Sequence, residues 1–200
     1  MLIDHTNKPM MRLRVNRTRQ ADLSGPMLAE AHRSVGVELA ASIAIHLTLE
    51  ETPIEHVTGP STGVQIKPGS ELIVIAMMRA GLFVAEGIWA SIPGSTLVLQ
   101  SVNVSLQTLR AKDRTIVIVD SVINTGNSIR NVLAMVKKLE PSYVAVASLV
   151  AFRGNLDKLV DDFPDVDFHV ARVSDHSYVG KGPTDTGSRL FGTTNWGLES

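Results

Sequence analysis

Short hydrophobic runs alternate with amphipathic stretches along most of the chain. Runs typical of strands buried on both faces of a sheet occur at 71–76, 95–99, 115–120, 143–151 and 166–171. Apolar residues recur at helical spacing at 26–49, 82–90, 129–139 and 155–163. Strands that alternate with helices predict an α/β fold, with a doubly wound, mainly parallel sheet and helices on both faces.

Both ends of the chain and one internal stretch depart from this alternation. Residues 1–20 mix Arg and Lys with apolar side chains, and we expect an N-terminal arm that is irregular or contacts a second subunit. Residues 52–66 contain several Pro and Gly residues, which predict a loop or short hairpin. The glycine-rich stretch 178–193 is expected to be neither a helix nor a central strand. The length predicts a single domain, 1–200, ending in a polar segment, 172–200.

Composition excludes several classes of function. The chain has no cysteine, which excludes disulfides, thiolate chemistry and cysteine-based zinc sites. A net charge of −1 argues against a nucleic-acid binder. No apolar run approaches the ~18 residues of a membrane span, and the N-terminus lacks the order of a signal peptide, so we expect a cytoplasmic protein. The six histidines show no metal-binding spacing; we expect His32 and His46 to be surface or satisfied core residues, and only His176 to lie near a site.

The most informative motif couples the strand at 115–120 to a polar turn, Asn124-Thr-Gly-Asn-Ser128, and a helix. Thr125 and Ser128 supply hydroxyls, and Gly126 lets the backbone approach a phosphate closely. A helix N-terminus with free amides binds a phosphate monoester. Asp120, at the carboxyl end of the strand, is placed to hold sugar hydroxyls or a metal.

A second motif, Met78-Arg-Ala-Gly81, also lies between a strand and a helix. Carboxyl ends of parallel strands share one edge of the sheet, so Arg79 is expected near Asp120. A guanidinium beside a glycine turn suits a second phosphate or a pyrophosphate.

The third motif is the stretch from Tyr178 to Thr193. Tyr178 is suited to stack on a planar ring, and free backbone amides in such a loop can recognise a base. Asp185 is suited to hold a metal-bound water.

Together these motifs resemble the uracil phosphoribosyltransferases, a branch of the type I phosphoribosyltransferases, over about 17–196. The first is similar to the phosphoribosyl-pyrophosphate (PRPP) fingerprint Val-Asp-Pro-Met-Leu-Ala-Thr-Gly-Gly-Ser. The second resembles the pyrophosphate loop Leu-Arg-Ala-Gly-Leu, and the third the uracil-binding segment Tyr-Ile-x-Pro-Gly-x-Gly-Asp-Ala-Gly-Asp-Arg-x-Phe-Gly-Thr. The resemblance implies transfer of the phosphoribosyl group from PRPP to uracil, giving UMP and pyrophosphate. It also implies Mg²⁺ bound with PRPP, a glycine-rich C-terminal hood over the base, and a homodimer or higher homo-oligomer.

The resemblance also assigns roles to residues. The catalytic residues would be Arg79, Asp120 and Asp185, with Asp185 reaching the metal through water. PRPP would be bound by Arg79, Ala80, Gly81, Asp120, Ser121, Asn124, Thr125, Gly126, Asn127 and Ser128. The pyrimidine base would be bound by Tyr178, Val179, Thr184, Asp185 and Thr186.

The sequence departs from the family pattern within these motifs. Ser121 replaces a proline, Asn124 an alanine and Asn127 a small residue, while Thr184 and Thr186 replace glycine and alanine. The segment 100–114 is shorter than the lid-bearing segment of the family. Two alternatives therefore stay open: a phosphoribosyltransferase for a different base, and a catalytically weak regulator that binds PRPP or a nucleotide.

Overall fold

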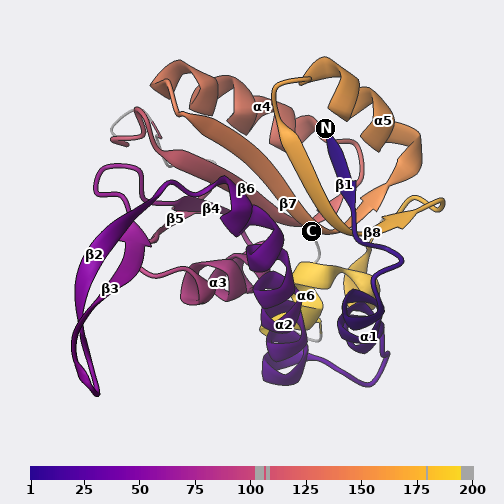
Figure 1. The fold of residues 1–200 in the computed structure, drawn as a ribbon. Helices are drawn as coiled ribbons and strands as arrows, with labels where there is room; N and C mark the ends of the chain where they lie inside the picture. Colours follow the sequence, from indigo (N-terminus) through magenta and orange to yellow (C-terminus); the bar gives the residue numbers. More distant parts are fainter. Residues whose placement is uncertain (102–105, 107–108, 179, 195–200) are drawn as a thin grey trace.

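The computed structural model describes residues 1–101, 106, 109–178 and 180–194. Its centre is a six-stranded sheet in which every neighbouring pair is parallel (Figure 1). The strand order is β1 (Leu2–Asp4), β8 (Asp167–Ser174), β7 (Tyr143–Phe152), β6 (Thr115–Ile123), β4 (Ile73–Met77) and β5 (Thr96–Gln100). Because helices cover both faces of the sheet, its central strands are apolar on both sides.

The helices form two layers around the sheet. One face is covered by α1 (Pro9–Thr18), α2 (Gly25–Ile43) and α3 (Leu82–Ser91). The other is covered by α4 (Asn127–Val136) and α5 (Arg153–Asp162). The described residues also form the short 3₁₀ helices η1 (Ala44–His46), η3 (Lys137–Leu139) and η4 (Gly182–Thr184), and the short helix α6 (Thr186–Phe191). The predicted α/β fold with helices on both faces is therefore confirmed.

Helices α2 and α3 meet through glycine. A β-carbon at Gly36 of α2 would lie 2.1 Å from the carbonyl oxygen of Val84, and one at Gly87 of α3 would lie 2.2 Å from that of Arg33. Both distances are shorter than any real contact, so a side chain at either position would force the helices apart. This close crossing holds α3, and the loop that precedes it, against the body of the protein.

A two-stranded antiparallel hairpin projects from the body (Figure 1). It consists of β2 (Leu49–His56) and β3 (Gly59–Ile66). The hairpin predicted as one alternative for 52–66 is thus confirmed. The helix expected at 26–49 ends earlier, at Ile43, because Leu49 already pairs with Ile66 in the hairpin.

Three further segments differ from the sequence-based expectation. Residues 1–20 are not irregular, since β1 pairs with β8 and Pro9 starts α1 at a position that tolerates proline. Strand β6 continues past Asp120 to Ile123 because β7 still offers pairing partners there. The C-terminal stretch contains η4 and α6, although its glycine content argued against a helix. No helix in the described parts of the chain is long and apolar enough to cross a membrane.

Candidate active site

The loop after β4 rests directly on the backbone of β6. A β-carbon at Gly81 would lie 2.4 Å from the carbonyl oxygen of Val119 and 3.1 Å from Cα of Asp120. Only glycine allows this approach, which brings the Arg79 loop beside Asp120 as the sequence predicts. The peptide bond between Met78 and Arg79 is cis.

The polar turn between β6 and α4 has the geometry of an anion site. Gly126 adopts a left-handed conformation, with φ of 76°, and α4 begins at the next residue. Thr125, Asn127 and Ser128 are exposed, so the hydroxyls of Thr125 and Ser128 lie at the surface. The backbone amide of Asn127 donates to the Thr125 hydroxyl oxygen at 3.4 Å, and the first amides of a helix have no partner within the helix itself. The carbonyl oxygen of Asn124 accepts a hydrogen bond from Nδ2 of Asn155 at 2.9 Å, which fixes the start of the turn.

The surroundings of Asp120 favour the protonated form of its carboxyl group. Burial raises the pKa of its carboxyl group to about 7, and hydrogen bonds from the backbone amides of Ser121 and Val122 offset part of this rise. The pKa of this carboxyl group therefore lies close to neutral pH. The group lies toward the edge of the sheet where open α/β folds bind ligands.

The C-terminal hood, of which the structure describes residues 172–178 and 180–194, folds over this edge and is held by hydrogen bonds among its own residues. Asp185 caps α6 by accepting a hydrogen bond from the Ser188 amide at 2.7 Å. The hydroxyl of Tyr178 donates to the Thr184 carbonyl and lies 3.3 Å from the Thr186 hydroxyl. Val179, also predicted to bind the base, lies outside the described residues.

Arg79 meets the hood at Gly187. A β-carbon at Gly187 would lie 3.4 Å from Oδ1 of Asp185 and 3.6 Å from Nη2 of Arg79. The Arg79 guanidinium carbon also lies 6.0 Å from the centre of the Phe191 ring. The fold thus brings together the loop after β4 and the hood, which are about a hundred residues apart in sequence.

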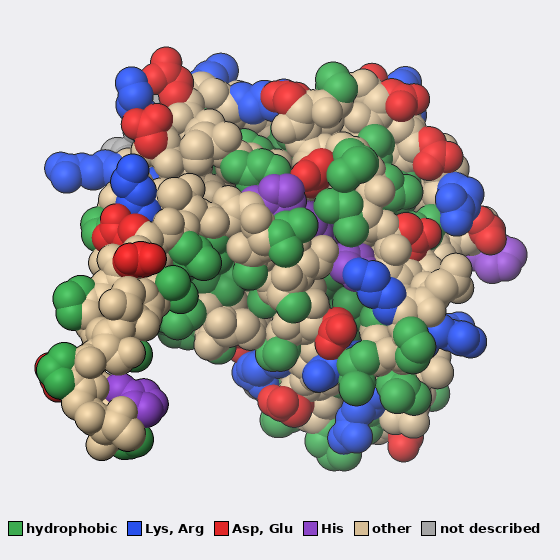
Figure 2. Space-filling model, viewed as in Figure 1, with side chains coloured by type: hydrophobic (Ala, Val, Ile, Leu, Met, Phe, Trp, Pro, Cys, Tyr) green, Lys and Arg blue, Asp and Glu red, His purple; other side chains and the backbone are tan. Residues whose placement is uncertain are grey.

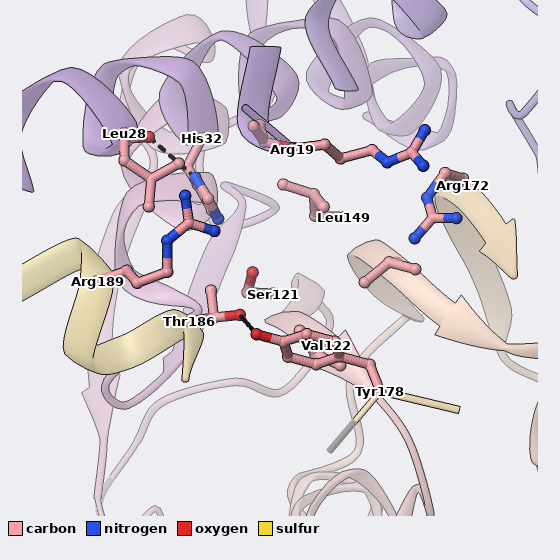
Figure 3. Close-up of a pocket in the computed structure, with 12 residues that line it drawn as sticks. Arg19, Leu28, His32, Ser121, Val122, Leu149, Arg172, Tyr178, Thr186 and Arg189 are labelled. Atoms are coloured by element: carbon pink, nitrogen blue, oxygen red, sulfur yellow. Dashed lines mark hydrogen bonds between the residues drawn. The ribbon is translucent and has the colours of Figure 1, made fainter. Parts of the chain in front are cut away.

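A cavity of about 250 Å³ opens between the hood, β6 and the α1–α2 layer (Figure 3). It is lined by Thr18, Arg19, Leu28, His32, Ser121, Val122, Leu149, Val150, Arg172, Tyr178, Thr186 and Arg189. Ser121, Tyr178 and Thr186 were predicted at the site, whereas the three arginines and His32 were not. His176, expected near the site, is exposed and does not line the cavity.

The family model for uracil phosphoribosyltransferase matches residues 5–193. This chain belongs to the uracil phosphoribosyltransferase family. It is accordingly a phosphoribosyltransferase, with the fold expected of that class.

Solved structures agree on the fold of this family member. It resembles the AQ2163 protein from Aquifex aeolicus with a TM-score of 0.81 at 22% identity, over 96% of this chain and 98% of that one. It also resembles the TT1426 protein from Thermus thermophilus with a TM-score of 0.52 at 16% identity, over 80% and 96% of the respective chains.

His32 faces the cavity of the phosphoribosyltransferase as a neutral hydrogen-bond acceptor. Its Nδ1 lies 2.9 Å from the Leu28 carbonyl oxygen, so this nitrogen carries the proton and Nε2 keeps its lone pair. Burial, reinforced by the charge of Arg189, lowers the pKa of His32 to about 4, while its bond to Leu28 opposes the shift. In Figure 3 the second ring nitrogen points toward the cavity, where it can accept from an N–H group of a ligand.

The opposite end of the cavity is positively charged. Burial and the neighbouring charge of Arg19 lower the pKa of Arg172, and Nε of Arg172 has no hydrogen-bond partner within the described residues. Arg189 is already engaged, since its Nη2 donates to the carbonyls of Gln20 and Leu23, both at 2.8 Å.

Sequence reasoning missed the three arginines and His32 because they come from separate elements. The position of His32 four residues after Leu28, on the apolar face of α2, was the one available signal.

Proposed function

We propose that this phosphoribosyltransferase transfers the 5-phosphoribosyl group from PRPP to uracil, forming UMP and pyrophosphate. The observation that carries the proposal is the convergence of three elements on one edge of the sheet. The Arg79 loop packs on β6 at Asp120, the turn at 124–128 opens α4 beside it, and Gly187 brings Asp185 close to Arg79. A cavity bounded by Tyr178 and Thr186 adjoins these groups.

In the proposed reaction, a ring nitrogen of the base attacks C1′ of the ribose as the bond from C1′ to the pyrophosphate oxygen breaks. Pyrophosphate leaves with the bonding electrons, and the proton of the attacking nitrogen passes to solvent. Positive charge develops on the ribose, so the anionic form of Asp120 stabilises it while binding the ribose hydroxyls. The guanidinium of Arg79 offsets the charge that develops on pyrophosphate, and the amides at 126–128 hold the 5′-phosphate.

The residues fit Mg²⁺ that enters with PRPP. Oδ1 of Asp185 accepts from Ser188, while Oδ2 makes no hydrogen bond with any of the described residues. Carboxylate oxygens and pyrophosphate oxygens are the ligands that Mg²⁺ prefers, and it retains several waters when bound. Asp185 would hold such a water, and the ion would neutralise pyrophosphate charge.

The direct test is incubation of the protein with PRPP, Mg²⁺ and uracil, followed by chromatography for UMP. Asp120→Asn is the matched control because it keeps the shape of the side chain and removes its charge. UMP formed by the parent protein and much less by the variant supports the proposal. PRPP that raises the melting temperature without any UMP, even at high protein concentration, would instead support the binding regulator.

A second candidate, transfer to a base that carries a negative charge, is favoured by the cavity. Among the described residues that line the cavity there is no Asp or Glu, whereas there are three arginines, Arg19, Arg172 and Arg189. Neutral uracil leaves the unpaired Nε of Arg172 without a counter-charge. A pyrimidine carboxylate would pair with Arg172 and Arg19 in the bidentate manner that guanidinium groups favour.

Competition among bases decides between the two candidates. Product formation is compared for uracil, for uracils that carry a carboxylate at C5 or C6, and for purines, all at equal concentration. The parent protein and Arg172→Gln are measured side by side. Preference for a carboxylate that disappears in Arg172→Gln supports the second candidate. A wide preference for uracil that the variant retains excludes it.

A further inference from the structure

We propose that His46, Asp167 and His169 bind a transition-metal ion, with Zn²⁺ the best match, at a site remote from the phosphoribosyltransferase centre. Nitrogen or oxygen atoms of these three side chains all lie within 4.8 Å of one another. Asp167 is the first residue of β8, so the cluster lies toward the amino ends of the strands, whereas Asp120 and Arg79 lie at the carboxyl ends. Figure 2 shows histidine side chains gathered beside acidic ones near the middle of one face.

The spacing of the three side chains is close to that of a metal site. Nε2 of His46 lies 3.7 Å from Oδ2 of Asp167. Zinc ligands at about 2.0–2.1 Å in tetrahedral geometry are roughly 3.4 Å apart. The side chains therefore need to close by about an ångström to share one ion, which small rotations about their side-chain bonds supply.

Both imidazoles have a nitrogen available. Nε2 of His46 and Nε2 of His169 are buried, and neither makes a hydrogen bond with the described residues. His169 is completely buried, and its Nδ1 lies 2.9 Å from the Ser42 hydroxyl, which leaves Nε2 as the free atom. A buried nitrogen without a partner is costly, and a bound metal removes that cost.

The surrounding groups hold the ligands in position, as outer groups do in known metal sites. The Tyr143 hydroxyl donates to Oδ2 of Asp167 at 2.7 Å. The His46 ring stacks on the Tyr143 ring, with 4.1 Å between the ring centroids. The amine of Met1 pairs with the other oxygen of Asp167 at 3.2 Å.

The ligand set selects the kind of ion. Two imidazole nitrogens and one carboxylate suit Zn²⁺, whereas Mg²⁺ prefers oxygen ligands only. Side chains of His46 and Asp167 are 29% and 17% exposed, so a water can occupy the fourth position from the solvent side. The spacing of histidines in the sequence did not indicate this site, because His46 and Asp167 are far apart in the chain and meet only in the folded protein.

The experiment uses untagged protein stripped with a chelator and titrated with ZnCl₂ by calorimetry, and with Co²⁺ by visible absorption. We expect one ion per chain, a tetrahedral Co²⁺ spectrum and a higher melting temperature with zinc. His46→Gln and Asp167→Asn should each weaken zinc binding at least about tenfold, in line with loss of one ligand from a site. His176→Gln, which removes an exposed histidine elsewhere, should leave binding unchanged.

Three results would each overturn the proposal: no stoichiometric zinc in the parent protein, equal zinc affinity in the parent and both ligand variants, or a Co²⁺ spectrum like that of the hexahydrate. The Co²⁺ spectrum of the parent protein decides the question even where a variant fails to fold, because a hexahydrate-like spectrum excludes the site. UMP formation is measured separately, so failure of the proposed transferase reaction leaves this test unaffected.

Discussion

At the scale of single residues, Asp120 joins burial to function. Its carboxyl group has a pKa of about 7 because burial disfavours the charge that the proposed binding of PRPP would need. The ribose hydroxyls and the metal that accompanies PRPP would restore that charge on binding. The ligand-free protein therefore carries the cost of an unpaired carboxylate at pH values above the pKa.

We expect this cost to appear as a pH dependence of stability. The folded state keeps the Asp120 proton to about pH 7, whereas the unfolded chain loses it near its ordinary pKa of 3.8. Between these values the folded state binds more protons, so the free energy of unfolding falls as pH rises. The fall has a ceiling of about 4 kcal/mol, from roughly three pKa units at 1.36 kcal/mol each.

Urea denaturation of the parent protein and Asp120→Asn from pH 4 to pH 8 measures this contribution. The asparagine variant should lack the Asp120 contribution, so the difference between the two proteins should change across this range. A difference that stays constant with pH would show that Asp120 is ionised throughout.

Asp185 combines two roles that substitutions can separate. It caps α6 through Oδ1, and we propose that Oδ2 serves the metal. Asp185→Ser keeps a capping oxygen, so stability should hold, whereas Asp185→Ala should lose about 1 kcal/mol. Both should lower kcat/KM for the transferase by about tenfold or more, which is roughly 1.4 kcal/mol of transition-state stabilisation. Full activity of Asp185→Ser would show that Asp185 only caps α6 and has no role in binding the metal.

At the scale of elements, the crossing of α2 and α3 determines where the Arg79 loop lies. The loop leads directly into α3, and α3 is held against α2 by Gly36 and Gly87. A change at this crossing is therefore expected to shift the Arg79 loop without altering any residue of that loop.

Gly36→Ala should destabilise the protein despite the higher helix propensity of alanine. Its β-carbon would lie 2.1 Å from the backbone oxygen of Val84, and overpacking of this kind costs about 1–3 kcal/mol. Val37→Ala, on the exposed side of the same helix, should change the free energy of unfolding by less than about 0.5 kcal/mol. Thermal denaturation of the two variants and the parent protein measures the effect. An unchanged melting temperature for Gly36→Ala would contradict the claim that the crossing of α2 and α3 has no room for a side chain.

At the scale of the whole molecule, the hairpin β2–β3 is too exposed for an isolated chain. Val57 and Val64 are 95% and 68% exposed, and an apolar cavity lined by Leu49, Val64, Ile66 and Ile92 lies at its base. Exposed apolar surface of this kind marks an interaction site. We therefore propose that the protein forms a homodimer, and that its contact is the hairpin rather than the N-terminal arm.

Matched charge substitutions test this arrangement. Val57→Glu with Val64→Glu should convert a dimer to a monomer, because dimer formation would bury both charges. Leu13→Glu, at a 67% exposed position on α1, should leave the dimer intact. Light scattering after gel filtration measures the mass, and a monomer produced by Leu13→Glu alone would restore the arm as the contact.

How much the sequence predicts differs between elements. Five of the six strands of the sheet were located within three residues of their ends, because apolar runs buried on both faces need no other signal. Helix α6 was missed because its stability depends on the Asp185 cap and on contacts of Arg189 with the α1–α2 loop. The N-terminal strand was missed because three residues on the edge of a sheet carry too short a pattern.

The sequence by itself determined the alternation of strands and helices, the position of the polar turn at 124–128 and the motifs that place the chain in its family. Each depends on residues close together in the chain, where periodicity and turn chemistry act locally. Only the tertiary structure decided which distant residues meet. It placed Arg79 beside Asp185, gathered Arg19, His32 and Arg172 around one cavity, and brought His46 to Asp167, because such contacts follow from packing of the two layers on the sheet.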